Sequence, residues 1–91
     1  MKNFELEEVQ NLLQQGKNAE AKQLFENIAE TSTVEYWMLK GIIEQRFQQW
    51  GKAYNAYLKV QQIDAEHKEA KIQIAMIDSI LSFWNKDLFN P

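Results

Sequence analysis

The sequence predicts an all-α domain of antiparallel helical hairpins, with about five helices in 91 residues. Apolar residues recur at helical spacing along nearly the whole chain. Three glycines and one proline provide little interruption, which fits helices joined by short turns. Hydrophobic residues make up 45% of the chain and charged residues 25%, a balance typical of a folded domain and not of a disordered segment.

Two helices are predicted in the first third of the chain. Residues 3–15 place Leu6, Val9 and Leu13 near helical spacing. Gly16 is a favourable helix stop, and Asn18 is a favourable cap for the next helix. That second helix is expected over about residues 19–30.

A third and a fourth helix form the middle of the chain. Ser32 and Glu35 have the spacing of a capping box, in which each side chain satisfies a free backbone N–H of the other residue. The third helix is therefore expected to begin near Thr33 and to run to about residue 48. The fourth helix is expected over residues 50–63, followed by a turn around Asp64.

The fifth predicted helix, residues 67–84, is the most apolar and carries two apolar stripes. The first stripe contains Ala70, Ile74, Ile77, Leu81 and Trp84, and the second contains Ile72, Met76, Ile80 and Phe83. A terminal helix of a helical array normally shows water a polar face. Residues 85–91 form a tail with Leu88 and Phe89. We expect this tail to pack on the fifth helix, with self-association or a disordered tail as the alternatives.

Spaced residues between Trp37 and Ala65 resemble the tetratricopeptide repeat family. Its pattern has Trp, Leu, Gly and Tyr in a first helix, Ala and an aromatic residue four positions later in a second helix, and a closing Pro. Here Trp37, Gly41, Ala53 and Tyr57 match, whereas Lys40, Glu44 and Ala65 replace the Leu, Tyr and Pro of the pattern. A glycine inside a helix costs roughly 1 kcal/mol relative to Ala, so Gly41 requires a packing reason.

The resemblance implies a single domain, residues 1–84, with a right-handed superhelical stack. The pair Ala21 and Phe25 repeats the spacing of Ala53 and Tyr57, 32 residues later. This interval is near the family period of 34. Repeat 1 would cover about residues 2–32, repeat 2 about residues 33–66, and a capping helix about residues 67–84.

In this family the first helix of each repeat lines a concave groove that holds a peptide or a partner helix. The resemblance therefore implies a partner-binding groove lined by Leu6, Gln10, Leu13, Met38, Ile42, Gln45, Arg46, Ile72 and Met76. This set is largely apolar with a single cation, which favours an apolar peptide or helix. It lacks the basic cluster with which some relatives hold the C-terminal carboxylate of chaperones. Alternatively, the chain's own tail or a second copy covers these residues.

The composition argues against several function classes. The net charge of −3 gives no reason to expect a polyanionic ligand, and the aromatic residues fall on core-spaced positions, so we expect no nucleic-acid binding. No apolar run reaches the roughly 18 residues of a membrane span. The acidic segment MKNFELEEVQN does not resemble a signal peptide, so we expect a cytoplasmic protein.

Catalysis is also not expected. The chain has no cysteine and a single histidine, His67, so it offers neither a soft metal site nor a Cys/His pair. No Gly-rich phosphate loop is present, and no cofactor is predicted. The sequence therefore predicts a protein–protein interaction module, with a self-associating, homodimeric domain as the alternative.

Overall fold

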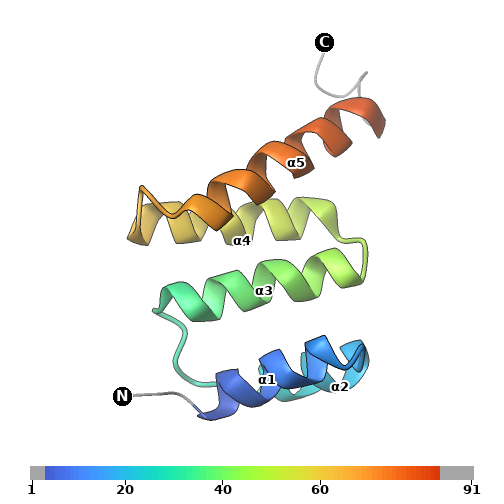
Figure 1. Ribbon diagram of the computed structural model, residues 1–91, viewed down its shortest axis with the longest axis vertical. Coiled ribbons are helices and arrows are strands. Elements are labelled where there is room, and N and C mark those ends of the chain that lie inside the picture. The colour runs from blue at the N-terminus through green and yellow to red at the C-terminus, as the bar shows by residue number, and fades with distance from the viewer. Residues whose placement is uncertain (1–3, 85–91) are drawn as a thin grey trace.

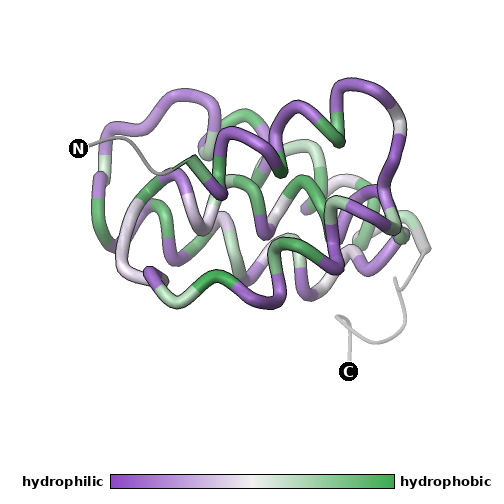
Figure 2. The backbone as a smooth tube through the Cα atoms, turned by 90° about the horizontal axis from the view of Figure 1, so that it is seen from below, coloured by the Kyte–Doolittle hydropathy of each residue, from purple (hydrophilic) through white to green (hydrophobic). Residues whose placement is uncertain are grey.

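The computed structural model describes residues 4–84, and these residues form five α-helices without a β-strand. The helices are α1 (Phe4–Gln14), α2 (Asn18–Phe25), α3 (Val34–Arg46), α4 (Trp50–Ile63) and α5 (Lys68–Trp84). Figure 1 shows α1 and α2 together at one end, followed by α3, α4 and α5 in succession. Hydrophobic and hydrophilic residues alternate along the helices, as Figure 2 shows, so each helix has one face that can be buried.

The order of packing follows the order of the chain. α3 contacts both helices of the α1–α2 hairpin as well as α4, whereas α5 packs mainly on α4. The predicted all-α class and the helical hairpins are therefore present. A direct link between α3 and α5 is the hydrogen bond that Gln45 Nε2 donates to Gln73 Oε1, at 2.9 Å.

The turn between α1 and α2 depends on Gly16. Its φ of +78° lies in the left-handed region that glycine enters without steric cost. The N–H of Gly16 and of Lys17 bond back to the carbonyls of Leu13 and Leu12. The predicted cap at Asn18 is wrong: Lys17 precedes the helix and gives no side-chain cap. Asn18 is instead the first residue of α2, and its Oδ1 accepts a hydrogen bond from Arg46.

α2 is shorter than predicted because its C-terminus tightens after Phe25. The N–H groups of Asn27 and Ile28 bond to the carbonyls three residues before them, the pattern of a tightened last turn. The amide of Asn27 also donates to the carbonyl of Gln23. Ile28 is nevertheless buried, so the segment after the helix still contributes to the core.

The cap of α3 is Thr33 and not Ser32. Thr33 has extended backbone angles, and its Oγ1 accepts a hydrogen bond from the N–H of Tyr36 at 3.1 Å. Ser32 instead donates its hydroxyl and its backbone N–H to the carboxylate of Glu30. The predicted capping box therefore begins one residue too early, because Glu30 competes for the serine side chain.

The α3–α4 hairpin is packed around Gly41 and Tyr57. A Cβ atom added at Gly41 would lie 2.5 Å from Cζ of Tyr57, so only glycine fits beside that ring. Tyr57 is fully buried, and its Oη donates to Gln45 Oε1 at 2.7 Å. The neighbouring Ala53 and Ala56 are buried as well. The helix-interior glycine thus has the packing reason that its cost in helix propensity requires.

Two hydrophobic clusters make up the core. The first joins α1, α2, the segment after α2 and α3, and contains Leu6, Val9, Leu13, Ala21, Phe25, Ile28, Leu39 and Ile43. Phe25 stacks on Tyr36 there, with ring centroids 4.6 Å apart. The second cluster joins α4 and α5 around Ala53, Tyr57 and Ile77.

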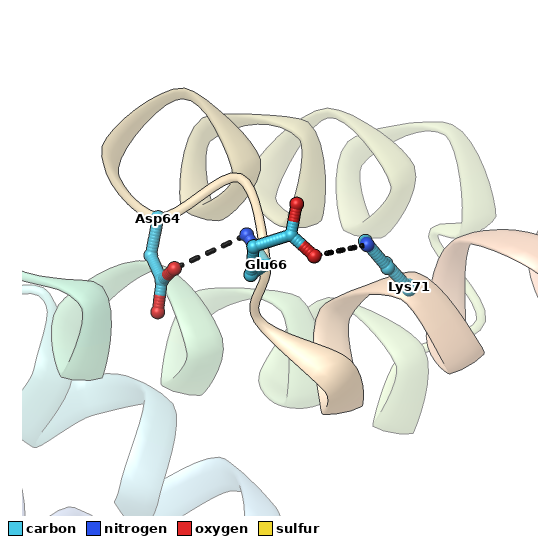
Figure 3. A network of polar contacts seen from close by, with 3 residues as sticks. All are labelled: Asp64, Glu66 and Lys71. Carbon is cyan, nitrogen blue, oxygen red and sulfur yellow. Dashed lines mark hydrogen bonds and ion pairs between the residues drawn. The ribbon is translucent and has the colours of Figure 1, made fainter.

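Polar contacts hold the turn between α4 and α5 (Figure 3). Asp64 Oδ1 accepts a hydrogen bond from the N–H of Glu66, whose carboxylate pairs with Lys71 at 3.1 Å. His67 immediately precedes α5, and its Nδ1 accepts a hydrogen bond from the N–H of Ala70. The fifth helix therefore begins one residue later than predicted, with the histidine as its cap.

The two apolar stripes of α5 have different environments. Ala70 and Ile77 of the first stripe are buried against α4, and Ile74 and Leu81 are half-buried. In the second stripe Ile72, Met76 and Phe83 are 60%, 43% and 74% exposed. The predicted packing of Leu88 and Phe89 lies outside the described residues. None of the helices within residues 4–84 combines the length and hydropathy of a membrane span.

Candidate partner-binding site

A hollow of about 1130 Å³ lies where α1 and α3 approach the start of α5. We call it the α1–α3 concavity. Figure 1 shows the N-terminal ends of α1, α3 and α5 on the same side of the molecule. The lining comes from α1, the α2–α3 loop, α3 and the residue before α5: Phe4, Glu5, Leu6, Glu7, Gln10, Glu30, Thr33, Val34, Glu35, Met38, Leu39, Ile42 and His67.

Apolar side chains of the core form part of this lining. Leu6 and Leu39 are buried, yet they still border the concavity. Met38 and Ile42, one turn apart on α3, are half-buried. Ile42 packs against the first core cluster and Met38 against the second. The apolar part of the surface therefore rests on packed side chains, which fixes its shape for a ligand.

Four glutamates also line the concavity. Glu5 and Glu7 come from the first turn of α1, Glu35 from the first turn of α3, and Glu30 from the loop before it. The Ser32 hydroxyl, at 2.6 Å, and then the Ser32 N–H lower the pKa of the Glu30 carboxyl. Hydrogen bonds to the ionised form keep this exposed carboxylate charged.

The residues predicted to line a groove divide into two groups. The structure brings Leu6, Gln10, Met38 and Ile42 together in the α1–α3 concavity. The other five lie outside its lining. Leu13 is buried in the first core cluster. Ile72 and Met76 are exposed on α5.

Gln45 and Arg46 make structural contacts at the other end of α3. Gln45 accepts from Tyr57 and donates to Gln73, which joins α3, α4 and α5. Arg46 Nη1 donates to the carbonyl of Leu13 and to Asn18 Oδ1, at 3.1 and 2.9 Å. The only cation of the predicted groove therefore holds the α1–α2 turn, and the concavity has no Lys or Arg among its described lining residues.

Sequence reasoning did not identify the acidic part of the lining. The glutamates lie in first helical turns and in a loop, where acids are expected for helix stability alone. The signal that could have found them is the common direction of α1 and α3, which Figure 1 shows and which places residues of both first turns on the lining of the concavity. The turn around Asp64 is predicted from the sequence, but the placement of His67 beside α1 and α3 depends on tertiary packing.

A smaller hollow of about 210 Å³ lies on the α3–α4 hairpin and is basic. Its lining is Trp37, Lys40, Lys52, Asn55, Ala56 and Lys59. The ammonium group of Lys59 lies 6.0 Å from the ring centroid of Trp37. At about 100° per residue, Trp37 and Lys40 fall on nearly the opposite side of α3 from Met38 and Ile42. The two hollows are therefore separate surfaces of opposite charge.

The other chemical features within residues 4–84 concern metal ligands and the phenol of Tyr57. No group of three His, Cys, Asp or Glu side chains in that range comes together as a set of metal ligands. Tyr57 has a raised pKa, first because it is buried and second because of the charge of Glu69. This phenol is packed in the core beneath Gly41, so it is a structural group.

Comparison with known proteins returned no relative: no protein-family model matches the chain, and neither the curated proteins nor the solved structures contain a significant match.

Proposed function

We propose that this chain is a cytoplasmic, non-catalytic protein–protein interaction module with tetratricopeptide-like stacking, and that the α1–α3 concavity holds a peptide or helix of a partner protein. The observation that carries the proposal is the position of this hollow of about 1130 Å³ on the first helices of the two hairpins. Packing of α3 against both helices of the preceding hairpin also supports a repeat-like stack.

The surface has the properties of a peptide-binding groove. It combines an apolar region, in which Met38 provides an adaptable side chain, with polar groups that can fix the orientation of a ligand. A partner helix would place apolar residues at helical spacing against Met38 and Ile42.

Selection from a random peptide library displayed on phage tests this function. We expect the full chain to enrich peptides whose binding shifts the backbone amide NMR signals of Met38 and Ile42. The variant Gln10→Trp fills the concavity from an exposed position and should abolish binding while leaving the melting temperature unchanged. The control Gln62→Trp places the same side chain at an exposed position outside the lining and should bind normally. Peptides that bind both variants equally would contradict the proposal.

A second candidate function is homodimerisation through α5, which the exposed stripe of Ile72, Met76 and Phe83 favours. Burial of an apolar stripe of this kind against a second copy is a usual basis of helical dimers. Light scattering over a range of concentrations should then give a dimer for the full chain and a monomer for Ile72→Glu/Met76→Glu. A monomer at all concentrations would exclude this function.

A further inference from the structure

We propose that the partner segment of the α1–α3 concavity is a cationic amphipathic helix, with Lys or Arg residues flanking an apolar stripe. This inference rests on the proposed function and specifies the chemistry of its ligand. Its basis is the joint presence of an apolar floor and acidic surroundings in the same hollow.

The described lining of the concavity contains acidic side chains and no Lys or Arg. The acidic side chains are four glutamates. Each helix N-terminus contributes roughly +0.5 of a charge, so the ends of α1, α3 and α5 together supply about +1.5. Glu30 and Glu35 alone carry two formal negative charges, which already exceed this, and a cationic ligand is therefore favoured over an anionic one.

Apolar and acidic groups are arranged as an amphipathic helix requires. Met38 and Ile42 lie one turn apart on α3 and provide an apolar strip, which Leu6 of α1 extends. Carboxylates come from different elements around this strip: α1, the α2–α3 loop and the first turn of α3. An amphipathic helix would place its apolar residues on the strip and its cations beside these carboxylates.

Glu30 shows that one of these charges is held in place. Its Oε1 accepts the hydroxyl of Ser32 at 2.6 Å and the N–H of Ser32 at 3.1 Å. A carboxylate oriented by two hydrogen bonds loses less side-chain entropy when a cation binds than a freely rotating one does. Glu30, together with Glu35 in the first turn of α3, provides the two positions at which the charge is tested.

The experiment uses the full chain and three synthetic 14-residue peptides. The first peptide has Leu at helical a and d positions and Lys elsewhere; the second replaces every Lys by Glu. The third has the composition of the first with the Leu residues redistributed, so that no apolar stripe forms. Binding is measured by fluorescence anisotropy, and the site is located from the amide NMR shifts of the protein.

We expect the Leu/Lys peptide to shift the signals of Met38 and Ile42 and to bind at least tenfold more tightly than the other two. Glu30→Gln/Glu35→Gln should weaken it about three- to tenfold, the usual effect of two exposed charge pairs. The matched control Glu20→Gln/Glu26→Gln removes two exposed charges outside the concavity and should change the affinity less than twofold. Raising the salt concentration should weaken only the Leu/Lys peptide.

The contrary outcomes separate the two proposals. Equal binding of the Leu/Lys and Leu/Glu peptides at Met38 and Ile42, or equal effects of the two double variants, would overturn the cationic partner and leave the groove function standing. Shifts confined to Ile72, Met76 and Phe83, or the absence of shifts at Met38 and Ile42 with every peptide, would overturn both.

Discussion

Gly41 and Tyr57 approach each other so closely that the glycine has no room for a side chain. A Cβ at position 41 would lie 2.5 Å from Cζ and 2.6 and 2.9 Å from the two Cε atoms of the phenol ring. Tyr57 cannot withdraw easily, because it is fully buried and bonded to Gln45. This pair sets the distance between α3 and α4, the hairpin that connects the two core clusters.

Replacement of Gly41 by alanine should therefore destabilise the protein. Alanine improves helix propensity by roughly 1 kcal/mol, but overpacking at a site this tight costs about 3 kcal/mol. The free energy of unfolding should fall by about 2 kcal/mol, as measured by urea denaturation. A stabilised Gly41→Ala variant would show that Tyr57 moves aside at little cost.

The double variant Gly41→Ala/Tyr57→Ala tests whether the ring is the cause. In the Tyr57→Ala background the added methyl group meets no ring, so the Gly41→Ala change should become neutral or stabilising. The coupling energy between the two positions should then be comparable with the loss in the single variant. Simple additivity of the two changes would point to another origin of the destabilisation.

Tyr57→Phe should remove one hydrogen bond and one ionisable group, the phenol. Loss of the bond to Gln45 Oε1 should lower the free energy of unfolding by about 1 kcal/mol at pH 8. Burial raises the folded-state pKa of Tyr57. The contribution of the neutral Tyr57 phenol to the free energy of unfolding is therefore complete below the unfolded-state pKa of about 10, and it is lost as the pH rises through the folded-state pKa.

The difference in free energy of unfolding between the wild type and Tyr57→Phe should thus decrease above about pH 10. Denaturation curves of the two proteins at a series of alkaline pH values provide the measurement. A constant difference between them across that range would contradict the raised pKa.

Thr33→Ala should destabilise α3, whereas Ser32→Ala should not remove its cap. The Thr33 hydroxyl accepts the N–H of Tyr36, and loss of such a cap costs about 1 kcal/mol. Ser32→Ala instead removes the hydroxyl bonded to Glu30, so the pKa of the Glu30 carboxyl should rise toward its ordinary value. Thermal unfolding and an NMR titration of the carboxyl carbon separate the two effects. Equal losses of stability would indicate that both residues cap the helix.

Arg46→Met should loosen the first hairpin from α3. The guanidinium bonds the carbonyl of Leu13 and the side chain of Asn18, and methionine keeps the aliphatic stem without the donors. We expect a loss of about 1–2 kcal/mol of stability and faster amide hydrogen exchange around Gly16. Peptide binding in the α1–α3 concavity should be retained, because Arg46 lies outside its lining. Loss of binding without loss of stability would place Arg46 in the site.

The sequence by itself determined the helices and the faces that they bury. Helical periodicity predicted α4 at its observed bounds and α1 to within one residue, because long apolar stripes and a left-handed glycine at position 16 are local signals. The caps were less predictable. Ser32 and Thr33 are both suitable residues, and the choice between them depends on Glu30, which takes the serine hydroxyl.

Only the tertiary structure decided which of the predicted groove residues share a surface. Leu13 and Leu6 have the same spacing signal, yet Leu13 is enclosed in the core whereas Leu6 borders the concavity. Helical periodicity shows which face of a helix is apolar, but it does not show how far along that face a neighbouring helix covers it. That coverage depends on how α1, α3 and α5 are placed, and their placement involves long-range contacts such as those of Arg46 with Leu13 and of Gln45 with Gln73.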